Sequence, residues 1–167
     1  HSPPNTMTVF VDRPESVCQF GIARHDITPP AGIYHRMWGA ATHQRAAGVH
    51  RPLWACAMVF RGSTAEGMSA DDQVVVTLDH CVLGPRELAG LRQAIAAATG
   101  YDPSSLIVLF SHTHAAGLMD LDRRDRPGGD QIPSYLADLN RIVAELTCQA
   151  LQAVRPATLT YATGHCT

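Results

Sequence analysis

Two short apolar runs near the middle of the chain, separated by a helical pattern, constrain the fold more than any other feature. Residues 73–78 are almost wholly apolar and rich in valine, which is typical of a buried strand. A helix is predicted for 85–99, because Pro85 suits a first helical position and Gly100 provides a C-terminal stop. Residues 106–110 then predict a second buried strand.

The same alternation continues towards the end of the sequence. A second helix is predicted to begin at Pro133 and to end at Pro156, and another strand is expected over 158–162. This order of strands and helices, with short connections, favours parallel pairing through right-handed crossovers. We therefore predict an α/β fold whose sheet is mostly parallel or mixed, with helices packed on its faces.

The first third of the chain is less regular. Strands are predicted over 17–24 and 54–61, and the paired prolines Pro29 and Pro30 exclude a helix after the first of them. Residues 31–52 are predicted to form a long loop. Since long loops in compact domains are often functional, we expect this one to form a wall of a site.

Composition excludes several classes of function. The chain has 167 residues, a net charge of −2 and 46% hydrophobic residues, which is typical of a globular domain, with residues 1–6 expected to be a tail. All thirteen basic residues are arginine, so an enzyme that needs a lysine, such as a Schiff-base enzyme or a P-loop NTPase, is excluded. The balanced charge gives no reason to expect nucleic acid as a partner. Five cysteines, widely spaced, predict reduced thiols rather than a disulfide framework.

Hydropathy predicts no transmembrane segment, because no apolar stretch approaches the roughly 20 residues that span a bilayer. The N-terminal residues have no signal-peptide core. We therefore expect a cytoplasmic location, and note that a secreted protein whose signal peptide had been removed would have the same sequence.

Polar residues follow each of the three last predicted strands. These segments are 79–81 (DHC), 111–114 (SHTH) and 164–166 (GHC), and they contain four of the nine histidines. Ligands of parallel α/β sheets bind beyond the carboxyl ends of the strands, so we expect these segments to meet at one edge. The sequence therefore predicts a histidine-rich site there.

His112 and His114 are the strongest candidates within this site. In extended backbone, residues two apart point to the same face, so both imidazoles can meet one metal ion or substrate. A single His-x-His pair is also common among surface and hydrogen-bonded histidines. Metallo-β-lactamase-like hydrolases are excluded, because Ala116 and Gly117 stand where their motif continues with an aspartate and a third histidine.

Four segments together carry a resemblance to a known family. Residues 21–32 are GIARHDITPPAG, residues 48–55 are GVHRPLWA, an apolar strand leads to Asp79, and residues 111–114 are SHTH. In order and spacing these segments resemble the N-terminal part of the catalytic domain of neutral/alkaline, non-lysosomal ceramidases. The resemblance implies that residues 7–167 are the N-terminal portion of a larger hydrolase domain.

The resemblance also implies an activity and roles for particular residues. It implies a zinc-dependent amidase in which a metal-activated water attacks the N-acyl amide bond of ceramide, a lipid substrate. One of the family's zinc ligands corresponds to His112, and a second histidine that lines the catalytic pocket corresponds to His114. We expect Asp79 either to orient a ligating histidine or to cap the following helix.

Two departures from the family leave an alternative open. Residues 115–117 are Ala-Ala-Gly where the family usually has Ser-Gly-Pro, and the family's other zinc ligands come from sequence beyond residue 167. The alternative function is therefore a non-catalytic fragment or binding domain with an incomplete metal site. We interpret the remaining histidines as surface or hydrogen-bonded structural residues, and the tryptophans as packing residues: His25, His35, His43, His50, His80, His165, Trp38 and Trp54.

Overall fold

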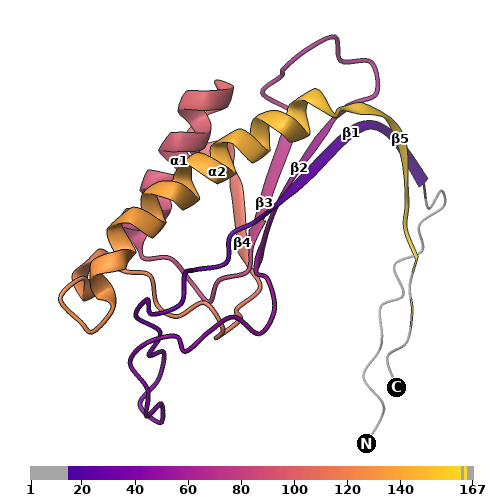
Figure 1. The fold of residues 1–167 in the computed structure, drawn as a ribbon. Helices are drawn as coiled ribbons and strands as arrows, with labels where there is room; N and C mark the ends of the chain where they lie inside the picture. Colours follow the sequence, from indigo (N-terminus) through magenta and orange to yellow (C-terminus); the bar gives the residue numbers. More distant parts are fainter. Residues whose placement is uncertain (1–14, 163, 165–167) are drawn as a thin grey trace, which may run out of the picture.

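A five-stranded sheet with two α-helices on one side forms the described part of the chain (Figure 1). The computed structural model describes residues 15–162 and residue 164. The strands are β1 (Glu15–Asp26), β2 (Trp54–Gly62), β3 (Gln73–Leu78), β4 (Ile107–Phe110) and β5 (Arg155–Thr160). The α-helices are α1 (Pro85–Thr99) and α2 (Ile132–Gln152), and three short 3-10 helices span Pro103–Ser105, Leu121–Arg123 and Gly129–Gln131.

The sheet is mixed, which agrees with the prediction of an α/β fold with a mostly parallel or mixed sheet. Its strand order is β4-β3-β2-β1-β5, and only β3 and β4 pair in parallel. The helix between them, α1, is the predicted crossover and has the predicted bounds. The three remaining pairs are antiparallel, so parallel pairing is confirmed for one crossover only.

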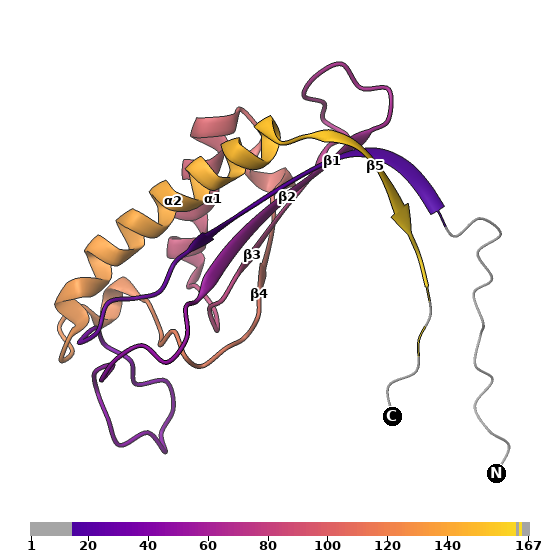
Figure 2. The same ribbon diagram turned by 45° about the vertical axis from the view of Figure 1, so that its right-hand side comes forward.

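Strand β5 contradicts the second predicted crossover. It pairs antiparallel with the first half of β1, at the edge of the sheet opposite β4. Helix α2 ends beside β1, where a Cβ on Gly21 would lie within 3 Å of Val154, and only two residues connect α2 to β5. The chain therefore continues outwards along β1 (Figure 2) instead of returning over the sheet. Strand β5 thus ends away from the ends of β3 and β4, which contradicts the prediction that all three strands end at one edge. Residues 165 and 166 of that prediction, including His165, lie outside the described residues.

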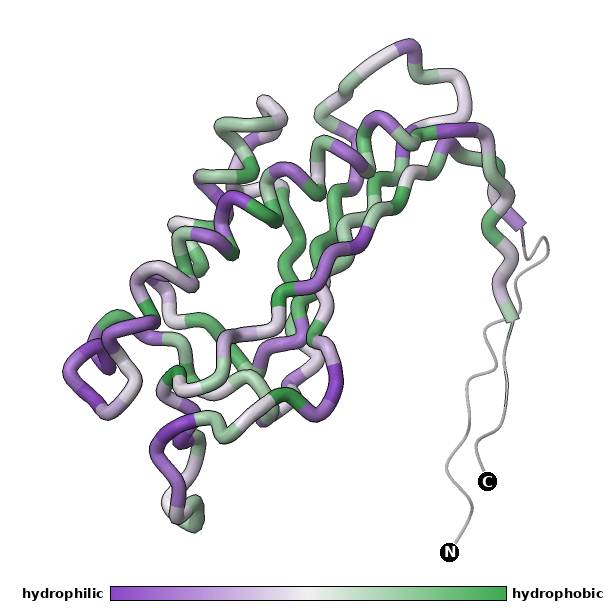
Figure 3. The backbone as a smooth tube through the Cα atoms, in the orientation of Figure 1, coloured by the Kyte–Doolittle hydropathy of each residue, from purple (hydrophilic) through white to green (hydrophobic). Residues whose placement is uncertain are grey.

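Both helices cover the same face of the sheet, and the core lies between them and the strands (Figures 1 and 2). Figure 3 shows the apolar character of the strands behind the helices. The opposite face is open: Ile22 and Leu109 are each 50% exposed. The predicted buried strand at 106–110 is therefore an edge strand with one face uncovered, because both helices pack on the other side.

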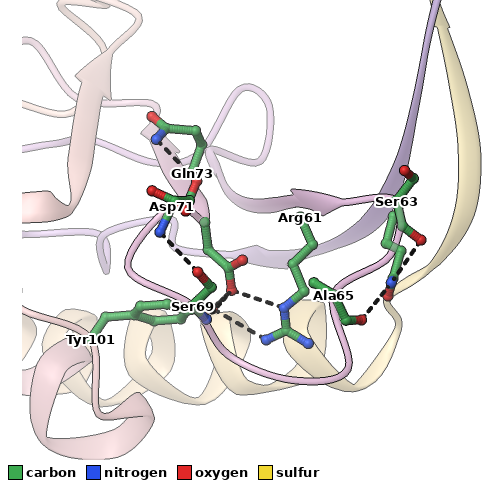
Figure 4. Close-up of polar contacts among 9 residues, drawn as sticks. Arg61, Ser63, Ala65, Ser69, Asp71, Gln73 and Tyr101 are labelled. Atoms are coloured by element: carbon green, nitrogen blue, oxygen red, sulfur yellow. Dashed lines mark hydrogen bonds and ion pairs between the residues drawn. The ribbon is translucent and has the colours of Figure 1, made fainter.

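A buried ion pair lies at the end of the sheet where β2 ends and β3 begins (Figure 4). The Nε atom of Arg61 lies 2.8 Å from Oδ2 of Asp72, and the hydroxyl of Tyr101 donates to the same oxygen at 2.5 Å. Burial on its own would raise the pKa of Asp72, but the hydrogen bonds from Arg61 and Tyr101 hold that pKa below its ordinary value. This network fixes the turn between β2 and β3.

The opposite end of the sheet carries the long loop. Residues 31–52 form a loop as predicted, with a single isolated β-bridge between Tyr34 and Arg45. Figure 1 places this loop at the end of the sheet where β3 and β4 end, which is the end at which the site was expected. Within residues 15–162, no helix has the length and apolar character needed to cross a bilayer.

Candidate metal centre

Cys81, His112 and His114 form one cluster of metal-ligating side chains. One ligand atom from each of the three residues lies within 4.8 Å of the other two. Parallel pairing of β3 with β4 brings these segments together, and the amide of Ser111 donates to the carbonyl oxygen of Leu78 at 3.0 Å. The predicted meeting of residues 79–81 with the SHTH segment is therefore confirmed.

The ring of His112 is held against Cys81. Its Nδ1 lies 3.2 Å from the carbonyl oxygen of Cys81, so Nδ1 carries the proton and donates it to that carbonyl. Nε2 then carries the lone pair and lies 3.8 Å from the sulfur of Cys81. Among the described residues other than glycine, His112 alone has a positive φ, of 60°. Strain of this kind is often found at functional positions.

His114 packs between His112 and Trp38. Its ring centroid lies 5.3 Å from that of His112 and 4.2 Å from that of Trp38, which meets it edge-on. Trp38 is 60% exposed, so the interpretation of this tryptophan as a packing residue misses its place at the rim of the cluster. The indole limits the orientations open to the His114 imidazole.

The long loop is fastened to the SHTH turn by His35 and Gly117. Nε2 of His35 donates to the carbonyl oxygen of Ala115 at 2.8 Å, so Nδ1 of His35 accepts a hydrogen bond from Nε2 of His43 at 2.9 Å. Gly117 has a φ of 73°, and a Cβ there would lie 3.0 Å from backbone atoms of Tyr34 and His35. His35 and His43 are therefore hydrogen-bonded, as expected, and they position the loop.

A cavity of about 480 Å³ lies beside the SHTH turn. Residues of the 28–53 segment line it together with Asp79, Thr113 and Ala115, whereas His112 and His114 do not. The long loop is thus a wall of this cavity, as the sequence predicted. The cavity and the Cys81/His112/His114 cluster flank the same turn.

Asp79 lies in the cavity wall rather than at the start of a helix. Its Oδ2 accepts a hydrogen bond from the amide of Trp54 at 2.9 Å. Helix α1 begins after Gly84 without a side-chain cap, so the alternative that Asp79 caps this helix is wrong. A role of Asp79 in orienting a ligating histidine stays a prediction.

His80 is a buried structural residue, as expected. Tyr135 donates its hydroxyl proton to the carbonyl oxygen of Ile27 at 2.8 Å and accepts from Nε2 of His80 at 2.7 Å. His80 is fully buried, and its burial lowers its pKa to about 4. This neutral imidazole anchors the segment that leads into Cys81.

Comparison with known proteins identifies the fold. No protein-family model and no curated protein matches the sequence. Among solved structures, neutral ceramidase from Pseudomonas aeruginosa matches with a TM-score of 0.64 and 19% identity, over 87% of this chain and 23% of that one. A second structure, a ceramidase complexed with C2, matches with a TM-score of 0.61 and 18% identity, over 87% and 22%.

The chain therefore has an α/β fold that forms part of a larger domain in the structures it matches. Both of those structures are of ceramidases, so the resemblance seen in the sequence is confirmed at the level of the fold. The chain spans less than a quarter of the length of those structures.

The cluster fits the zinc that the resemblance implies. Imidazole nitrogen and cysteine sulfur are the donors that zinc prefers in proteins, and the cluster contains both. Sequence reasoning identified His112 and His114 but interpreted all five cysteines, Cys81 among them, only as reduced thiols. The position of Cys81 directly after a strand, at the edge where a site was expected, was the signal that could have identified it.

Proposed function

We propose that this chain is part of a metal-dependent hydrolase that cleaves the N-acyl amide bond of a ceramide-like lipid. The observation that carries the proposal is the Cys81/His112/His114 cluster at the ends of two parallel strands in a ceramidase-like fold. The donors support a metal centre, and the fold supports a ceramidase-like hydrolase.

Each candidate residue has a definite part in this proposal. His112 binds the metal through Nε2, since its Nδ1–H is held by the carbonyl oxygen of Cys81. His114 belongs to the catalytic centre, where Trp38 restrains its ring. Asp79 is a positioning residue that holds the amide of Trp54 at the cavity wall. A bound zinc ion supplies Lewis-acid polarisation of a carbonyl and lowers the pKa of a coordinated water to about 7.

The cavity beside the turn suits an amphipathic amide. Its walls include the apolar side chains of Ile33, Val49 and Leu53, and its polar groups include His50 and Arg51. Apolar walls with a few polar groups are typical of sites for small organic molecules. We propose that the acyl part of the substrate lies against this wall.

The test is hydrolysis by the protein after removal of metal with a chelator and reloading with zinc. We expect cleavage of a long-chain N-acylsphingosine or of shorter N-acyl amides, abolished in His112→Ala and retained in His25→Ala, which changes an exposed histidine on β1. Cleavage of the short amides alone makes the Ala115–Gly117 segment the first candidate for the altered specificity. If the zinc-loaded protein cleaves neither class, the amidase proposal is wrong and a binding domain is favoured.

A further inference from the structure

We propose that the Cys81 thiolate is a metal ligand together with His112 and His114. The described chain then supplies three protein donors, one of them sulfur, where the sequence resemblance assigned a ligand role to His112 only. This inference shares the metal of the proposed function but requires nothing of the amide substrate.

The separation of the donor atoms fits two ligands of one ion. With metal–sulfur and metal–nitrogen distances of about 2.3 and 2.1 Å, tetrahedral geometry puts the two donors about 3.6 Å apart. The sulfur of Cys81 lies 3.8 Å from Nε2 of His112 and 3.6 Å from Nδ1 of the same ring. The separation of the donor atoms is therefore close to the required one, and a rotation of the His112 ring that turns Nε2 towards the ion completes the geometry.

The backbone around the pair holds His112 in the orientation that a ligand needs. Metal-ligating histidines usually donate their second ring N–H to a carbonyl or carboxylate, which fixes the tautomer. Here the acceptor is the carbonyl oxygen of Cys81, at 3.2 Å from Nδ1. Cys81 thus contributes both that outer hydrogen bond and the sulfur, and the left-handed backbone at His112 turns the ring towards it.

The burial of the three donors defines an open side. Cys81 is 7% exposed, His114 is half-buried and His112 is exposed, so the sulfur lies at the floor of the cluster and the imidazoles lie nearer to solvent. Three donors at one place would anchor an ion, and the exposed side leaves it open to further ligands. Metal binding releases the thiol proton of Cys81 to solvent.

The donor set also determines which metals bind. Thiolate and imidazole ligands select zinc, cobalt or copper over magnesium, calcium and manganese, which prefer oxygen donors. We therefore expect a centre that binds Zn²⁺ and Co²⁺ and is not populated by Mg²⁺ or Ca²⁺.

The test is titration of the metal-free protein with Co²⁺, followed by absorption spectroscopy. Wild-type protein is expected to develop a thiolate-to-cobalt charge-transfer band in the near ultraviolet. Cys81→Ser is expected to lose the band and to bind Co²⁺ weaker by about tenfold or more. Cys148→Ser is the matched control, because Cys148 lies on α2 and its sulfur contacts the carbonyl oxygen of Ala98 instead; it is expected to retain the band.

The outcomes separate this inference from the proposed function. Co²⁺ bound to the wild type without a thiolate band overturns the role of Cys81 and leaves His112 as a metal ligand. A band that persists in folded Cys81→Ser also overturns it. Failure of the wild type to bind Co²⁺ contradicts both proposals. Because the wild-type spectrum decides the main question, the test stands even if a variant fails to fold.

Discussion

Nε2 of His80 lies 2.7 Å from the hydroxyl oxygen of Tyr135, although 55 residues separate them in the chain. The tyrosine donates its own proton to the carbonyl oxygen of Ile27, so the histidine must be the donor. This chain of hydrogen bonds joins the segment after β3 to helix α2 and to the segment after β1. It anchors the residue that immediately precedes Cys81.

The burial of His80 predicts loss of stability in mild acid. Burial lowers the pKa of His80 from 6.5 to about 4, so between these values the unfolded chain binds a proton that the folded chain does not. The contribution of the His80 proton equilibrium should therefore leave the free energy of unfolding of the metal-free protein unchanged above pH 6.5. Below pH 6.5 that free energy should fall as the pH decreases towards 4. At about 1.4 kcal/mol per pKa unit, the full loss is about 3 kcal/mol.

Urea unfolding at a series of pH values measures this loss. In His80→Gln the amide keeps a donor for Tyr135 but does not titrate, so the decrease between pH 6.5 and 4 should become much smaller. A decrease of the same size in this variant would show that other groups are responsible.

Backbone strain at His112 predicts an unusual order of stabilities. Its φ of 60° lies in the left-handed region, which costs about 1–2 kcal/mol for a residue with a Cβ. His112→Gly should therefore be more stable than His112→Ala by about 1 kcal/mol, after allowance for the greater entropy of the unfolded glycine chain. Thermal unfolding of the two metal-free variants gives the comparison, and equal stabilities would argue against strain at this position.

The docking of the long loop on the SHTH turn depends on Gly117. A Cβ there would meet backbone atoms of Tyr34 and His35 at 3.0 Å, and the φ of 73° adds a further penalty. We expect Gly117→Ala to destabilise the protein by about 2 kcal/mol and to accelerate hydrogen exchange at the His35 amide. Gly39→Ala is the control, because a Cβ at Gly39 has open space. Unchanged exchange in Gly117→Ala would contradict the proposed fastening of the loop.

The Arg61–Asp72 pair predicts a large effect far from the site. The side chain of Asp72 is only 1% exposed, so Asp72→Asn leaves the Arg61 guanidinium without its partner charge and should cost about 3 kcal/mol of stability. Arg141→Gln removes an exposed ion pair with Glu145 on α2 and should leave the urea midpoint nearly unchanged. Similar midpoints for the two variants would refute the structural importance of the buried pair.

The sequence predicted well those helices and strands whose bounds depend only on residues within the element or next to it. Residues 73–78 and 85–99 have the predicted bounds, because a valine-rich apolar run, a proline at the start and a glycine stop act over a few residues. The open face at Leu109 could not be predicted in this way. An apolar run has the same sequence whether one or both of its faces are covered, and both helices pack on the same side.

Contacts between residues far apart in the sequence explain the other differences between the predicted and the observed structure. The direction of β5 depends on where α2 ends beside β1, which no local pattern specifies. At the site, the spacing of His112 and His114 was informative because both lie in one short segment. Cys81 forms no motif with them, since 31 residues separate it from His112, and only the parallel pairing of β3 with β4 brings the sulfur to the imidazoles.

The most direct test of the metal centre is the zinc content of the protein, measured by elemental analysis after equilibrium dialysis against Zn²⁺ and removal of loosely bound ions. We predict about one zinc per chain in the wild type and in His25→Ala, and a large loss in His112→Ala and in Cys81→Ser. Zinc far below stoichiometry in the wild type, or the same zinc content in His112→Ala as in the wild type, would contradict the account.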